Sequence, residues 1–90
     1  MWFVYIVRCE DRTLYTGITT DAARRVEQHN SGRGASYTRS RGPVALVYVE
    51  SADDRGAALR REHEIKRMTA LEKQRLVTAA RLEKSATRRS

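Results

Sequence analysis

The chain has 90 residues, which is enough for one domain and close to the smallest size that a single core stabilises alone. Its single cysteine, Cys9, excludes an internal disulfide, and the sequence has no Cys/His cluster with zinc-ligand spacing. Lysine and arginine number 18 against 11 aspartates and glutamates, a net charge of +7. A domain this basic favours polyanions, so nucleic acid is the first partner to consider.

Two strands are predicted at the start of the chain. Residues 2–8 form a nearly continuous apolar run, which is typical of a buried strand. Residues 14–19 follow as a second strand, and the pair predicts a β-hairpin. The opening run is too short to cross a membrane and lacks the flanks of a secretion signal, so we expect a cytoplasmic protein with no membrane association.

A helix, a loop and a third strand come next. Asp21 is a plausible N-cap for a short helix over residues 22–30. Residues 31–43 contain three glycines and a proline among basic and hydroxyl side chains, which predicts a basic loop. Residues 44–50 are rich in β-branched and aromatic side chains, which favours a strand.

Two further helices are predicted in the last part of the chain. The first is capped by Asp53 or Asp54 and runs to about Met68. Thr69 and Glu72 have the spacing of a capping box, which opens the last helix.

The last helix is expected to end near residue 83. Residues 84–90 have no apolar period, so we expect one folded domain over 1–83 and a basic disordered tail over 84–90. The order β-β-α-β-α-α predicts an α+β fold, with a three-stranded mixed or antiparallel sheet flanked by helices.

One carboxylate stands out on the predicted second helix. Ala58, Leu59 and Ile65 define an apolar stripe, and Glu62 falls inside it. Burying a carboxylate costs several kcal/mol unless it is paired, neutralised or bound to a metal. An ion pair with a lysine or arginine and a metal site are therefore the two alternatives.

Four other side chains carry possible chemistry. Tyr5 and Tyr15 lie on adjacent strands, where ordinary core packing is the alternative to a functional role. Arg25 and His29 are four residues apart and share one helix face, for which a solvated charged surface is the alternative.

The predicted basic loop offers a second group of polar side chains. Arg33, Arg39 and Arg41, with Tyr37 among them, are suited to gripping phosphates and stacking on a base. A flexible solvated loop is the alternative.

Together these residues resemble the GIY-YIG nuclease superfamily, and in particular its small stand-alone bacterial members, whose function is largely uncharacterised. The motifs of that family are Gly-Ile-Tyr and Tyr-Ile-Gly, followed by an arginine on a helix and a later glutamate. Here they correspond to Phe3-Val4-Tyr5, Tyr15-Thr16-Gly17, Arg25 and Glu62, and the likeness extends from residue 2 to about residue 80.

The resemblance implies a role for each matching side chain. Tyr5 would be the general base, activated by nearby cations that lower its pKa from about 10. Arg25 would stabilise charge on the phosphoryl oxygens, and Glu62 would hold one Mg²⁺ or Mn²⁺. Tyr15 would orient water or phosphate, His29 would assist, and Gly17 would let the substrate backbone approach.

The resemblance also implies an activity. It predicts a metal-dependent endonuclease that hydrolyses phosphodiester bonds in nucleic acid. DNA is favoured over RNA as the substrate, a monomer is the favoured state, and DNA repair is the expected setting. Many family members add a late polar residue, often asparagine, which this sequence lacks after Asn30. The alternatives are a non-catalytic nucleic-acid-binding accessory protein that keeps the fold, and an interaction protein with an incidental basic surface.

Overall fold

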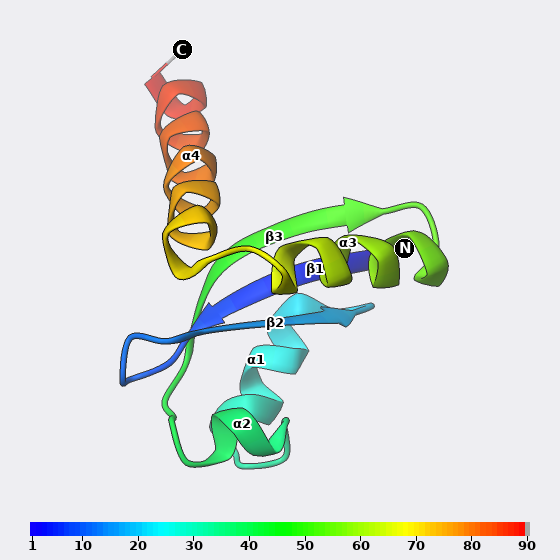
Figure 1. Ribbon diagram of the computed structural model, residues 1–90, viewed down its shortest axis with the longest axis vertical. Coiled ribbons are helices and arrows are strands. Elements are labelled where there is room, and N and C mark those ends of the chain that lie inside the picture. The colour runs from blue at the N-terminus through cyan, green and yellow to red at the C-terminus, as the bar shows by residue number, and fades with distance from the viewer. Residues whose placement is uncertain (90) are drawn as a thin grey trace.

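A computed structural model describes the backbone of residues 1–89 and the side chains of residues 1–82. The fold is α+β, as predicted, and its elements follow one another in the expected order with one short helix added (Figure 1). The elements are β1 (Trp2–Arg8), β2 (Leu14–Thr19), α1 (Ala22–Asn30), α2 (Ser36–Arg39), β3 (Ala45–Ala52), α3 (Arg55–Lys66) and α4 (Ala70–Arg89).

The three strands form one antiparallel sheet in the order β2-β1-β3. The central position of β1 explains its unbroken apolar sequence, because a strand with neighbours on both sides and helices on both faces has no solvated side. A β-bulge interrupts the pairing of β1 with β3 between Ile6 and Val7.

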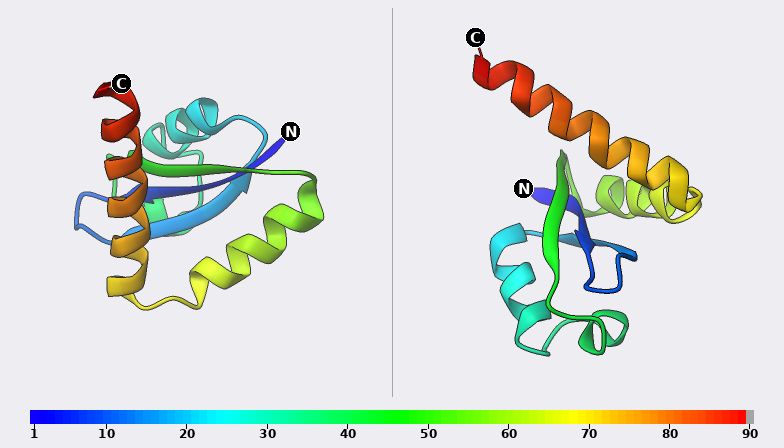
Figure 2. Two further views of the ribbon diagram at one scale, coloured as in Figure 1. Left: turned by 90° about the horizontal axis from the view of Figure 1, so that it is seen from above. Right: turned by 90° about the vertical axis from the view of Figure 1, so that its left-hand side faces the viewer.

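The sheet separates two small cores. Val4 and Ile6 point to one face, where they pack with α3 and α4 through Ala58, Ile65 and Val77. On the other face the buried residues are Tyr5, Val7, Cys9 and Val44, with Tyr15 and Val26 packed against them. Figure 2 shows the resulting layers, with α1 and α2 on one side of the sheet and α3 and α4 on the other.

The predicted helix starts are confirmed. Asp21 accepts a hydrogen bond from the backbone N–H of Arg24, and Asp54 accepts one from that of Ala57. The backbone N–H of Thr69 donates to Glu72, and that of Glu72 donates to the Thr69 hydroxyl, as a capping box requires.

Two predictions about the less regular segments are wrong. The segment 31–43 is not a loop throughout, because α2 forms inside it around the buried Thr38. The last helix does not end near residue 83: α4 continues through Arg89, which the high helix propensity of Ala, Lys and Arg explains without an apolar period. Ser90 lies outside the described residues, and the division into a domain and a tail remains a prediction.

No helix within the described part of the chain combines the length and the apolar character needed to span a bilayer.

Candidate active site

The site is built around Tyr5, which lies on the central strand opposite Gly17 of β2. The Tyr5 ring crosses over Gly17, and a Cβ added at Gly17 would lie 2.6 Å from Tyr5 Oη. The Tyr5 side chain is 1% exposed. The glycine is therefore needed here because the phenol of Tyr5 occupies the space above it. Contact of Gly17 with a nucleic-acid backbone, which the sequence suggested, remains a proposal.

Replacing Gly17 by alanine is expected to lower the free energy of unfolding by about 1–3 kcal/mol, the usual penalty for overpacking a filled site. The Tyr5 ring cannot move away freely, because its hydroxyl is held by a buried hydrogen bond. Urea unfolding followed by circular dichroism measures the change. Gly56→Ala is the matched control, since a Cβ there meets only flexible side-chain atoms at 3.4 Å in a helix. Equal stability of the two variants would contradict this packing.

A chain of short hydrogen bonds runs from Tyr5 into the protein. Tyr5 Oη lies 2.8 Å from His29 Nε2, and His29 Nδ1 lies 2.7 Å from Thr38 Oγ1. The Thr38 hydroxyl in turn donates to the carbonyl oxygen of Ala35 at 2.9 Å. A Cβ on Gly34 would collide with the His29 ring, so this glycine is also required by the packing around the histidine.

The direction of these bonds follows from the proton count. The Thr38 hydroxyl has one proton and gives it to Ala35, so it accepts from Nδ1–H of His29. His29 Nε2 then carries a lone pair and accepts the phenolic proton of Tyr5. The network therefore sets the histidine tautomer that is able to remove a proton from Tyr5.

Arg25 contacts the same phenol from α1. Its Nε donates to Tyr5 Oη at 3.4 Å, and its Nη1 donates to Gln28 at 2.9 Å. Burial raises the pKa of Tyr5, and the hydrogen bond and charge of Arg25 offset this only in part. The expectation that nearby cations lower the pKa of Tyr5 is thus wrong for the protein alone, because loss of hydration penalises the phenolate more than one guanidinium stabilises it.

The pKa of His29 moves in the opposite sense. Burial lowers it first, because an imidazolium loses hydration in the interior, and the positive charge of Arg25 lowers it further. Tyr5 and His29 are consequently both neutral near pH 7, joined by a single shared proton.

Glu62 approaches the site from α3. Its side chain is 14% exposed, and its carboxylate lies 3.5 Å from Lys66 Nζ, one helical turn further on. Burial is the main cause of the raised pKa of Tyr5, but the negative charge of Glu62 contributes as well, so the two groups are close. Lys66 Nζ also lies 5.9 Å from the centre of the Tyr15 ring. The ion pair that the sequence offered is therefore present, and the same carboxylate lies near enough to Tyr5 for its charge to act on the phenol.

The donor set at Glu62 fits only one type of metal ion. The described residues contain no group of three or more His, Cys, Asp or Glu side chains placed to share an ion. Mg²⁺ and Mn²⁺ do not need such a cage, because they keep several waters and use one or two carboxylates together with phosphate oxygens. A single, partly buried carboxylate is consistent with that mode of binding.

Tyr15, Tyr37 and Arg41 form a stack beside the histidine. The Tyr15 ring meets the His29 ring edge-on, with 5.5 Å between the ring centres. It stacks on the Tyr37 ring, with 5.7 Å between the centres. The Arg41 guanidinium lies 4.1 Å from the centre of the Tyr37 ring and pairs with Asp11 at 3.2 Å. Tyr37 and Arg41 therefore already contact side chains of the protein, and a nucleic-acid base would have to compete with them for the Tyr37 ring.

Two arginines from the sequence analysis lie apart from this cluster. Arg33 and Arg39 are exposed, and within the described residues neither donates a hydrogen bond to the phenols or to His29. Their role in nucleic-acid binding remains a proposal. Asn30, the last residue of α1, has a structural role. Its side chain hydrogen-bonds to both the N–H and the carbonyl of Val44, the residue before β3.

Sequence reasoning missed two members of the site. Lys66 was detectable, because it follows Glu62 at the i,i+4 spacing of a helical ion pair. Thr38 had no such signal, since it meets His29 only through the folding of α2 against α1.

Comparison with known proteins agrees with this geometry. Residues 1–75 match the family model of the GIY-YIG catalytic domain. The chain is 61% identical over 74 residues to a UPF0213 protein of Haloquadratum walsbyi, covering 82% of this chain and 83% of the relative. It is 58% identical over 80 residues to a UPF0213 protein of Desulfotalea psychrophila, covering 88% and 73% respectively.

A solved structure supports the same assignment. The solution NMR structure of a UPF0213 protein of Bacillus halodurans superposes with a TM-score of 0.57 at 44% sequence identity, covering 88% of this chain and 85% of that one. Because the family model spans most of the chain and the relatives match it at high identity, the chain belongs to the GIY-YIG family, close to the UPF0213 proteins.

Proposed function

We propose that this protein is a metal-dependent endonuclease that hydrolyses phosphodiester bonds in nucleic acid, with DNA as the preferred substrate. The observation that supports it most is the pairing of Tyr5 with His29, because a buried phenol bonded to a neutral imidazole is equipped to move a proton. Arg25 and Glu62 bring a cation and a carboxylate to the same place.

The proton path begins at the attacking water. Tyr5 Oη takes a proton from this water while the phenolic proton moves to Nε2 of His29. The water oxygen forms a bond to phosphorus, and the bond between phosphorus and the leaving sugar oxygen breaks. The leaving oxygen takes up a proton from solvent, and His29 releases its own to restore the resting state.

Arg25 stabilises charge during this step. Its guanidinium lies against Tyr5 Oη, so it favours negative charge that develops on the phenol and on the adjacent phosphoryl oxygens. Thr38 keeps Nδ1–H of His29 occupied, which leaves Nε2 as the proton acceptor. Glu62 would hold Mg²⁺ or Mn²⁺, which when bound supplies Lewis-acid stabilisation of phosphate oxygens.

The pH dependence should reveal His29 in its neutral form. Burial and Arg25 hold the pKa of His29 below its ordinary value of 6.5, so protonation blocks the proton acceptor only below that pH. We expect kcat/KM to stay level as pH falls from about 8 and to drop only at a midpoint below 6.5, in a profile extended to about pH 5. A midpoint above 6.5 would show that His29 does not act as the neutral acceptor.

Cleavage assays test the function itself. The purified protein is incubated with nicked, branched and single-stranded DNA and with RNA of the same sequence, in Mg²⁺, in Mn²⁺ and in a chelator. We expect products only with metal, and more from DNA than from RNA. Cleavage that is unaffected by the chelator would refute the metal dependence.

A non-catalytic accessory protein is the second candidate. It is favoured by the Glu62–Lys66 ion pair, which satisfies the carboxylate without a metal, and by the raised pKa of Tyr5. For such a protein, a plot of log binding constant against log salt concentration has a slope of about −0.9 for each phosphate contacted on duplex DNA. It cleaves no substrate with any metal.

A further inference from the structure

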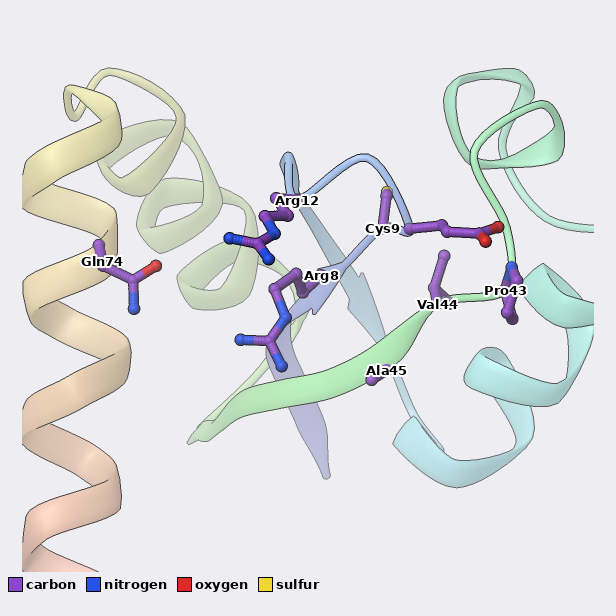
Figure 3. Close-up of a pocket in the computed structure, with 8 residues that line it drawn as sticks. Arg8, Cys9, Arg12, Pro43, Val44, Ala45 and Gln74 are labelled. Carbon is purple, nitrogen blue, oxygen red and sulfur yellow. The ribbon is translucent and has the colours of Figure 1, made fainter.

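A hollow lies away from the tyrosines, where the β1–β2 turn faces α4. It has a volume of about 690 Å³ and is lined by the end of β1, the turn, the start of β3 and one side chain of α4. Figure 3 shows that Arg8 and Arg12 project into it toward Gln74.

Neither arginine has an ion-pair partner among the side chains that the structure describes. In the part of the chain with described side chains, neither guanidinium makes a hydrogen bond or an ion pair. Glu10 also lines the hollow, but no ion pair connects it to either arginine. Two guanidinium groups that share a hollow repel one another, and a bound anion relieves that repulsion.

Arg12 also has an unusual backbone. Its φ of 71° lies in the left-handed region, which suits glycine, asparagine or aspartate. A long cationic side chain held at such a position is an outlier of the type that gathers at functional sites.

A neighbouring hollow adds a third cation to this part of the surface. It measures about 340 Å³, shares Arg12 and Gln74 with the first, and adds Lys73 of α4 and Leu14 of β2. Leu14 packs on the face of the sheet that α3 and α4 cover, whereas its neighbour Tyr15 packs on the opposite face. Three cationic side chains, Arg8, Arg12 and Lys73, therefore line two adjoining hollows at the hairpin end of the sheet.

We propose that Arg8, Arg12 and Lys73 form a subsite that binds a backbone phosphate of the nucleic acid flanking the bond to be cut. The planar forks of the arginines suit phosphate oxygens, and the Gln74 amide adds a neutral donor. The subsite rests on the proposed function for its location in a substrate path, but it acts in binding and not in the chemical step.

Binding measurements test the subsite separately from catalysis. Fluorescence anisotropy with a labelled DNA duplex in chelator follows affinity without cleavage, for the wild type, the Arg8→Gln/Arg12→Gln double variant and Arg60→Gln. Arg60 is an exposed arginine of α3 outside both hollows, so its variant measures the effect of losing one positive charge elsewhere on the surface. We expect the double variant to bind at least about tenfold more weakly. We expect its log-log salt slope to shrink by about 0.9 for each arginine removed, with a smaller effect for Arg60→Gln.

A second variant separates binding from folding. Arg12→Gly relieves the left-handed strain, so we expect its Tm to rise by about 4–8 °C while its affinity falls. A lower Tm would mean that Arg12 supports the fold instead.

Comparing two ligands distinguishes a backbone phosphate from free phosphate. Inorganic phosphate is titrated into one sample and an oligonucleotide into another, at the same total concentration of phosphate groups. In both, binding is followed by the NMR shifts of the Arg8 and Arg12 signals. Stronger binding of the oligonucleotide supports a backbone subsite, whereas equal binding assigns the hollow to free phosphate and overturns the proposal. Equal affinity of the double variant and the wild type overturns it as well. A wild type that binds DNA through these arginines but never cuts it refutes only the nuclease function.

Discussion

Replacing Tyr5 by phenylalanine is expected to lower the cleavage rate by about 10²–10⁴-fold, the usual contribution of a positioned general base. The substitution removes the oxygen that bonds to His29 Nε2 and to Arg25 while it keeps the ring over Gly17. The rate is measured at saturating metal and substrate, so that the loss reports on kcat.

Stability provides the control for this variant. Tyr5→Phe leaves a buried acceptor on His29 without its donor, which costs about 1–3 kcal/mol, and unfolding curves show whether the variant is folded at the assay temperature. Tyr48→Phe is the matched variant, because it removes a phenolic hydroxyl that bonds to Glu50 on β3. If the Tyr5 and Tyr48 variants cut equally fast, Tyr5 is not the base.

Replacing Glu62 by glutamine is expected to abolish most of the activity. Loss of the Glu62 carboxylate removes the proposed anchor for a hard divalent ion, whose Lewis-acid effect is worth several kcal/mol, or about 100-fold or more in rate. Binding of DNA in chelator should be unchanged or slightly tighter, because one negative charge beside Lys66 disappears. Calorimetric titration of Mn²⁺ in the presence of an uncleaved oligonucleotide gives a readout that does not depend on turnover.

Glu64→Gln is the matched control for the carboxylate. Glu64 lies two residues further along α3, is 65% exposed and pairs with Arg61, so its loss changes the charge without touching the phenols. Stability of either variant should change by only about 0–1 kcal/mol, because both ion pairs have an exposed partner. Retention of Mn²⁺ binding and full activity in Glu62→Gln would remove the metal role.

Lys66 gives the site an internal counter-ion. A carboxylate that is 14% exposed beside two phenols is poorly solvated, and the ammonium at 3.5 Å compensates part of that loss. Because the Lys66 side chain is half exposed, it is able to swing away when another cation approaches the carboxylate. The structure thus explains how Glu62 is tolerated in an apolar stripe before any metal binds.

Local sequence patterns predicted most of the helices and strands. The helix caps at Asp21 and Asp54 and the capping box at Thr69 act within a few residues, so their chemistry is readable from the chain. The apolar run of β1 and two of the three stripe positions, Ala58 and Ile65, followed from periodicity in the same way, whereas Leu59 lies outside that core. The errors were at α2 and at the end of α4, where weak local signals left the choice to packing or to helix propensity.

The sequence alone determined the identity and order of the chemical groups: two phenols, a guanidinium, an imidazole and a carboxylate on predicted elements. Only the tertiary structure decided how they act on one another. It placed Tyr5 over Gly17, joined its hydroxyl to His29 and fixed the histidine tautomer through Thr38. Those relations depend on strand register and on the packing of α2 against α1, which bring together residues distant in the chain. The shifts in pKa likewise depend on burial, which exists only after the chain has folded.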